Sequence, residues 1–270
     1  MAAKQEALAS IRALHEFYEK ARALTQLQGI SPKPGSIAAK GLDEYEREES
    51  VQSVHAQGSI LLQQATDHLA AFIQLAINHE ITLALSANAR AVVENSAIAY
   101  WLLDREVTIH KRVGRSLSFR KADLEQQRKI AKAWDPDFDP TNIDQRLDVV
   151  EALSVRLGFE RISRVRFTEI VRDTIGYEAH YRVLSALVHG NTSPLRQLGY
   201  QEVESLEGDD GVTIERSVRP LVVIYLCQVV AGAFIDALGA KFQLFGWDID
   251  GLANEVNPVL HILNTVVENR

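Results

Sequence analysis

The sequence predicts an all-α protein, a single multi-helix bundle, and three observations support this prediction. No proline occurs between Gly35 and Asp135, and a proline inside a helix costs about 3 kcal/mol. Aliphatic residues recur three and four positions apart, which is the spacing of a helix with one buried face. Hydrophobic residues make up 46% of the 270-residue chain, which is enough to form a sizeable core.

Glycines, prolines and capping residues delimit the expected helices. The proline-rich segment DPDFDP ends one long helix, and Thr141 or Asn142 caps the next. Gly176 separates two shorter helices. Alternating residues around GDDG predict a short hairpin or an irregular segment between residues 190 and 217. The expected helices span about residues 3–28, 50–78, 81–104, 107–134, 141–157, 160–173, 176–189, 219–245 and 247–268.

We expect one helical domain over residues 1–270, because neither an internal repeat nor a shift in composition marks a boundary. The loop ISPKPGS leaves a second arrangement open, in which residues 1–45 form an N-terminal helical arm. The chain begins without the apolar core of a signal peptide. Its most apolar stretch, 221–235, is shorter than the roughly 20 residues that span a bilayer, so we expect a buried core helix. These features predict a cytoplasmic protein without membrane contact.

Composition and motif spacing exclude several classes of function. A net charge of −7 argues against a chain built mainly to coat nucleic acid, although a local basic site stays open. The single cysteine, Cys227, allows neither an internal disulfide nor a cysteine-based zinc site. The histidines lack the spacing of a zincin or a di-iron bundle, and the sequence has no glycine-rich nucleotide loop. We therefore expect no metal and no cofactor.

The segment EAHYRVLSALVHGN carries the first candidate site. At about 100° per residue, four polar side chains of this helix fall within one narrow stripe. These side chains are Glu178, Arg182, Ser185 and His189. Because the helix is apolar on most other sides, we expect it to be buried, so that its polar groups find partners or line a cavity.

Arg182, six intervening residues and His189 resemble the Arg-x(4–6)-His motif of the HEPN superfamily, helical proteins that include many metal-independent endoribonucleases. The resemblance implies that the 2′-hydroxyl of RNA attacks the adjacent phosphate within a homodimer. His189 would move the proton and Arg182 would stabilise the charge on phosphorus, with Ser185, Glu178 or Asn191 assisting. The runs VVENSAIAYWLLD and LSALVHGN also resemble uncharacterised helical proteins of actinobacterial genomes, which imply no activity.

Glu94 is the second candidate, because a carboxylate on an apolar helical stripe needs a partner. Arg90, one turn earlier, is the nearest partner on the same helix. Pairing with Arg90 alone would make Glu94 structural. A cluster of Glu94 with Arg182 and His189 would instead form a site.

The third candidate is a basic helix. Nine basic and three acidic side chains lie between Arg105 and Lys132, so that a phosphate-rich ligand such as RNA could bind there. The alternative is a solvated basic face whose charge is balanced by the acidic stretches 43–49 and 202–210. The expected substrate-binding residues are Lys111, Arg112, Arg115, Arg90, Glu94 and Asn191.

Two functions of different classes follow from these features. The first is a HEPN-like, metal-independent endoribonuclease that acts through Arg182 and His189. The alternative is a non-catalytic helical protein that binds a protein partner or a small-molecule ligand. The alternative expects His189 to cap its own helix and Arg182 to be held by Glu178 at the surface.

Overall fold

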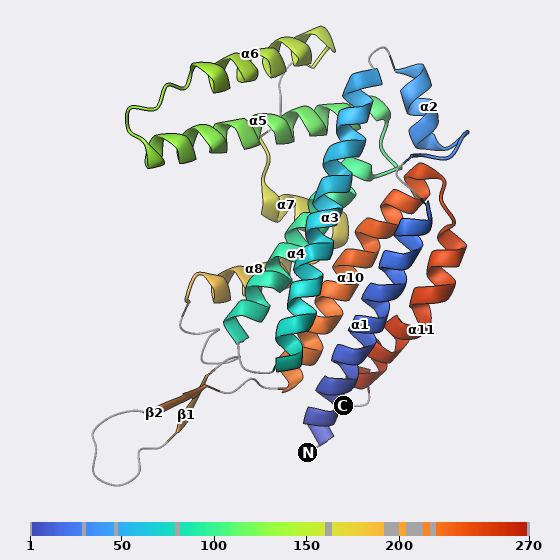
Figure 1. Cartoon of the computed structure of the whole chain (residues 1–270), viewed down its shortest axis with the longest axis vertical. Helices are drawn as coiled ribbons and strands as arrows, with labels where there is room; N and C mark the ends of the chain where they lie inside the picture. Colours follow the sequence, from blue (N-terminus) through green and yellow to red (C-terminus); the bar gives the residue numbers. More distant parts are fainter. Residues whose placement is uncertain are drawn as a thin grey trace.

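The computed structural model describes residues 2–28, 31–45, 48–78, 82–159, 164–191, 200–203, 213–216 and 220–268 (Figure 1). Its helices are α1 (Ala2–Gln28), α2 (Ile37–Glu44), α3 (Glu48–Asn78), α4 (Thr82–Leu103), α5 (Ile109–Trp134), α6 (Thr141–Arg156), α7 (Phe167–Ile175), α8 (Glu178–Val188), α10 (Pro220–Phe245) and α11 (Ile249–Glu268). The strands β1 (Tyr200–Val203) and β2 (Thr213–Arg216) pair antiparallel as a hairpin. The predicted all-α class is therefore confirmed, and of the two alternatives for residues 190–217, a hairpin or an irregular segment, the described residues show the hairpin.

Helix α10 forms the centre of the bundle because it is apolar on nearly all sides. It packs against α4, α1, α11 and α3. By length and composition alone α10 could cross a membrane, but 67% of its most apolar window is buried inside the bundle. The predicted core helix over residues 221–235 thus lies within α10.

Helix α1 belongs to this bundle and does not project from it. Its apolar face, which includes Leu14 and Phe17, is buried against α10 and α11. The Phe17 ring meets Phe234 of α10 edge-on at 6.1 Å. After α1 the chain forms α2, a short helix that the sequence analysis did not predict. The Ser36 hydroxyl caps α2 by accepting a hydrogen bond from the Ala39 N–H at 3.1 Å.

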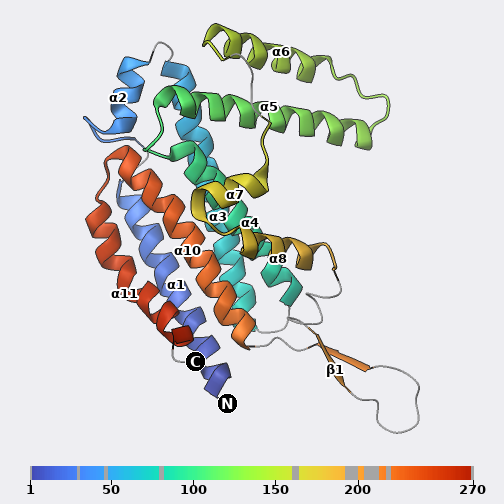
Figure 2. The same cartoon turned by 180° about the vertical axis from the view of Figure 1, so that it is seen from behind.

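A pair of helices projects from the bundle and carries the basic candidate residues. We call this pair the α5–α6 arm (residues 109–156). Its two helices run side by side and extend away from the bundle (Figures 1 and 2). The near end of α5 is tied to α3, since the Ser116 hydroxyl donates to Gln57 Oε1 at 2.9 Å. The far end carries Trp134, which is 90% exposed.

Helices α7 and α8 pack against α4 on the flank of the bundle. The sequence predicted a helix from about residue 160, but α7 begins at Phe167, and residues 160–163 lie outside the described part of the chain. Gly176 has φ +72° and ends α7, as predicted.

Candidate functional site

The polar stripe of α8 faces solvent. Tyr181, Leu184 and Leu187 fill the buried side of the helix, against α4. On the other side Arg182 donates two hydrogen bonds to Glu178 Oε1, at 2.9 and 2.7 Å, and its side chain is 67% exposed. The expectation that this stripe is buried is therefore wrong, because α8 uses only one face to contact the bundle.

The remaining α8 candidates lie around the C-terminus of that helix. His189 is exposed at the C-cap, where its backbone N–H donates to Ser185 O at 3.0 Å. Ser185 is half-buried. Asn191 is exposed, and its backbone N–H donates to Ala186 O at 3.0 Å. Together with Gly190 (φ +74°), these backbone hydrogen bonds end the helix.

Glu94 lies at the contact between α4 and α8. It accepts a hydrogen bond of 2.7 Å from the Tyr181 hydroxyl, and Arg90 Nη2 lies 3.7 Å from the same carboxylate oxygen. The Arg90 guanidinium also donates to the Tyr181 hydroxyl at 3.4 Å and lies 5.5 Å from the centre of its ring. Among the described residues, neither Arg182 nor His189 joins this cluster. The cluster of Arg90, Glu94 and Tyr181 therefore holds α8 to α4.

Two of the expected phosphate ligands on the basic helix are turned inward. Arg112 is 1% exposed, and its Nη1 donates to the carbonyls of Asp104 at 3.1 Å and Val107 at 2.6 Å. Arg115 Nη1 donates to the carbonyl of Trp101 at 2.5 Å and lies 3.5 Å from the Asp104 carboxylate. Both arginines thus bind carbonyls at or just beyond the C-terminus of α4, where positive charge is favourable. Burial lowers the pKa of both guanidinium groups.

Two of the outward bases of α5 form ion pairs within the α5–α6 arm. Lys121 pairs with Glu151 at 2.6 Å, and Arg128 pairs with Asp144 at 2.9 Å. The acids of these two pairs lie on α6, whereas the sequence analysis named two other acidic stretches. Residues 46–47 of the first stretch and 204–210 of the second lie outside the described residues. Lys111, at the start of α5, is exposed.

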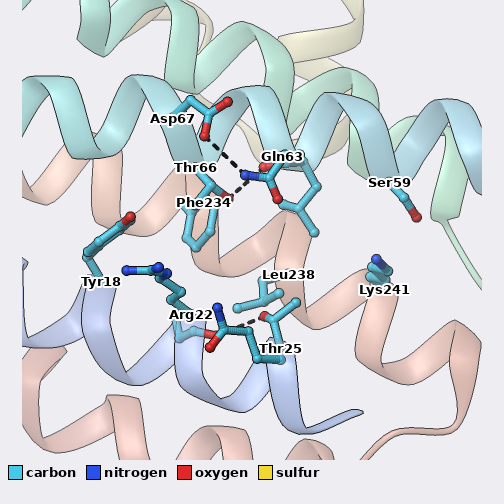
Figure 3. A pocket seen from close by; sticks show the side chains of 13 residues that line it. Tyr18, Arg22, Thr25, Ser59, Gln63, Thr66, Asp67, Phe234, Leu238 and Lys241 are labelled. Carbon is cyan, nitrogen blue, oxygen red and sulfur yellow. Dashed lines mark hydrogen bonds between the residues drawn. The ribbon is translucent and has the colours of Figure 1, made fainter. Parts of the chain in front are cut away.

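The structure also contains a cavity that the sequence analysis did not predict. This α1–α3–α10 cavity has a volume of about 360 Å³ and is lined by residues from 18–26 of α1, 59–67 of α3 and 234–241 of α10. Figure 3 shows Lys241 and Ser59 at one end, and Tyr18, Arg22 and Asp67 at the other. We call the first the deep end, since Lys241 is buried and Ser59 half-buried, and the second the mouth, where Arg22 and Asp67 are exposed.

Lys241 sets the electrostatics of the deep end. Its side chain is 8% exposed, and its Nζ lies 5.4 Å from the Phe245 ring centre and 5.0 Å from that of Trp247. Within the described part of the chain no carboxylate pairs with this ammonium group. Burial lowers the pKa of Lys241, because an unpaired charge is costly away from water.

His55, one turn before Ser59 on α3, lies next to this lysine. Its ring is buried and lies 5.1 Å from the Phe245 ring, and its Nε2 has no hydrogen-bond partner among the described residues. Burial, and then the charges of Arg112 and Lys241, lower the pKa of His55 to about 4. His55 is therefore neutral at pH 7, and Lys241 carries the positive charge at the deep end of the cavity.

A second cavity of about 360 Å³ lies between the start of α8, α10 and α11. It is lined by aromatic and amide side chains, including Tyr177, His180 and Tyr225, and the His180 ring stacks on Tyr225 at 5.5 Å. Where the structure describes its lining, this cavity has no acid, lysine or arginine. The α1–α3–α10 cavity is the stronger candidate because the ammonium group of its largely buried lysine has no counter-ion among the described residues.

The sequence holds one signal that could have revealed this site. Lys241 is the sole basic residue of α10, an otherwise apolar helix that forms the core. A lysine is almost never fully buried unless it is paired, so its position in a core helix indicates a local requirement for charge.

Comparisons with protein families, with curated proteins and with solved structures find no match to this chain. Among the described residues, no three histidine, cysteine, aspartate or glutamate side chains lie close enough to hold a metal ion.

Proposed function

We propose that this protein is a non-catalytic helical protein that binds a small anionic molecule in the α1–α3–α10 cavity. One observation carries the proposal: the Lys241 side chain is largely buried where it lines the deep end of the cavity, and its ammonium group pairs with no described carboxylate. An ammonium group removed from water is costly unless it gains a partner. An anionic ligand in the cavity would supply that partner.

The shape and lining of the cavity support the same function. Its volume of about 360 Å³ lies within the range of small-molecule sites, which is roughly 300–1,000 Å³. Eight of its thirteen lining residues are polar or charged and can hydrogen-bond a polar ligand, and Leu62, Phe234 and Leu238 add buried apolar surface beside them.

The geometry of α8 favours this alternative over the ribonuclease. The Arg182 guanidinium is already bound by Glu178, and His189 ends its own helix. The two residues are seven positions apart, so that about 10 Å of helix rise separates them. The ribonuclease and the homodimer stay predictions that no observation yet tests.

Thermal unfolding in the presence of small anions tests the proposed function. We expect at least one of three classes of organic anion (carboxylates, phosphate monoesters or sulfonates) to raise the Tm of the wild-type chain, because a ligand that binds the folded state stabilises it. Lys241→Met should abolish this rise. Lys129→Met removes the same charge from the exposed end of α5 and should leave the rise unchanged. No rise with any of the anions, or an equal rise in Lys241→Met, would overturn the proposal.

A further inference from the structure

The α1–α3–α10 cavity also restricts the class of anion, and this step rests on the function proposed above. We infer that the ligand is a monocarboxylate with a slender apolar body, bound with its carboxylate against Lys241 and Ser59 and its body directed to the mouth.

The charge available at the deep end favours a monoanion. Of the three basic side chains in this region, Arg112 is already bound to the carbonyls of Asp104 and Val107. His55 is buried beside two cations and is neutral at pH 7. Lys241 therefore offers one positive charge to the cavity. A carboxylate matches that charge, whereas a phosphate monoester carries about 1.5 to 2 negative charges at this pH.

The hydrogen-bond donors at the deep end also favour a carboxylate over a phosphate. The Lys241 ammonium and the Ser59 hydroxyl lie at this end of the cavity (Figure 3) and can serve the two oxygens of a carboxylate. A phosphate has three terminal oxygens, and proteins often bind it with arginine forks. The arginine of this cavity, Arg22, lies at the mouth.

The walls between the two ends fit an apolar body. Leu62, Phe234 and Leu238 are buried side chains that line the cavity, so an alkyl chain laid along them would leave water. Further out, Gln63 donates to Asp67 at 3.0 Å and forms a polar, exposed rim. Thr25 and Thr66 also line these walls, and their hydroxyls already donate to the carbonyls of Ala21 and Leu62. The ligand therefore passes from a charged end, along largely apolar surface, to a polar opening.

The size of the cavity limits the length of that body. At about 30 Å³ for each water-sized group, 360 Å³ holds about a dozen non-hydrogen atoms. Ser59 and Asp67 are eight residues apart on α3, which corresponds to about 12 Å of helix. Octanoate, with about ten non-hydrogen atoms in a linear chain, is a suitable probe.

Calorimetric titration of the full chain with octanoate, octyl phosphate and 1-octanol tests the inference. These probes share one alkyl chain and differ in their head groups. We expect octanoate to bind at least about tenfold more tightly than either of the others. Lys241→Met should remove the advantage of octanoate over octanol, and Lys129→Met should keep it.

Gln63→Trp changes an exposed residue at the mouth and should weaken octanoate binding by narrowing the entrance. This second variant keeps the test decisive if Lys241→Met does not fold.

The outcomes separate this inference from the proposed function. Tighter binding of octyl phosphate, lost in Lys241→Met, would overturn the carboxylate assignment and leave anion binding intact. Equal binding of octanol and octanoate would overturn the assignment of the head group to Lys241. Stabilisation by no anion at all would overturn the inference together with the proposed function.

Discussion

At the scale of single residues, three buried bases near one end of α10 show three ways to lower the cost of burial. Arg112 keeps its charge and donates to backbone carbonyls. His55 becomes neutral because its pKa is lowered to about 4. Lys241 lies over two aromatic rings and faces the cavity. Of these three bases, only Lys241 is charged and without a polar partner among the described residues, and an anionic ligand can supply that partner.

His55 makes the stability of the fold depend on pH. The unfolded histidine binds its proton near pH 6.5 and the folded one near pH 4, so the unfolded state holds more protons between these values. The stabilising contribution is complete above about pH 6.5 and is lost as the pH falls to 4, up to about 3 kcal/mol. Urea unfolding at pH 7 and 4.5 should show a smaller loss for His55→Gln than for the wild type. His261→Gln, at an exposed position, is the control, and parallel losses in all three proteins would contradict the assignment.

The candidate site could be predicted from the sequence only where its contacts are local. The spacing of Glu178 and Arg182, and of Arg90 and Glu94, is enough to anticipate both ion pairs. Tyr181 joins Glu94 from a helix 87 residues later in the chain, which no periodicity reveals. The cavity depends on the relative placement of three helices, so that its residues show no common pattern in the sequence.

At the scale of helices, α8 is held by one polar cluster in addition to its apolar face. The Tyr181 hydroxyl is the shared atom of that cluster, since it donates to Glu94 and accepts from Arg90. Burial raises the pKa of Tyr181, so this hydroxyl stays protonated and can donate at neutral pH. The polar part of the contact between α4 and α8 therefore depends on a single hydroxyl group.

Tyr181→Phe should loosen α8 selectively. The change removes the donor to Glu94 and keeps the buried ring, so we expect the free energy of unfolding to fall by about 1–2 kcal/mol. Hydrogen exchange should show faster exchange of the α8 amides, with α10 affected least. Tyr225→Phe, whose hydroxyl makes no hydrogen bond among the described residues, is the matched control. Unchanged exchange in α8 would mean that its apolar face alone holds the helix.

Helix positions were predictable wherever proline, glycine or long periodicity marks them. The long helices α1, α3, α4, α5 and α10 begin and end within a few residues of their expected limits. Helix α2 was missed because it has eight residues and follows a loop rich in proline and glycine. Its formation depends on the local Ser36 cap and on packing against α3 and α10, and this packing is a tertiary effect that the local sequence does not show.

At the scale of the whole molecule, the candidate sites lie on different parts of the bundle. The cavity is formed by α1, α3 and α10, whereas α8 packs on α4 and presents Arg182 and His189 to solvent. The α5–α6 arm extends from a third region, and ion pairs within the arm neutralise part of its basic surface. The overall arrangement therefore separates the proposed ligand site from the residues that resemble a nuclease motif.

RNA cleavage in the presence of EDTA tests whether Arg182 and His189 form a nuclease site, as opposed to the ligand site proposed in the α1–α3–α10 cavity. A nuclease needs a group that moves a proton and a group that stabilises charge within hydrogen-bonding reach of one phosphodiester. In this chain Glu178 already neutralises Arg182, and about 10 Å of helix rise lies between Arg182 and His189. We therefore expect wild type, His189→Ala and the exposed control His261→Ala to show the same absence of cleavage. Cleavage by the wild type and by His261→Ala that is lost in His189→Ala would overturn the non-catalytic assignment and favour a nuclease site completed by a second copy of the chain.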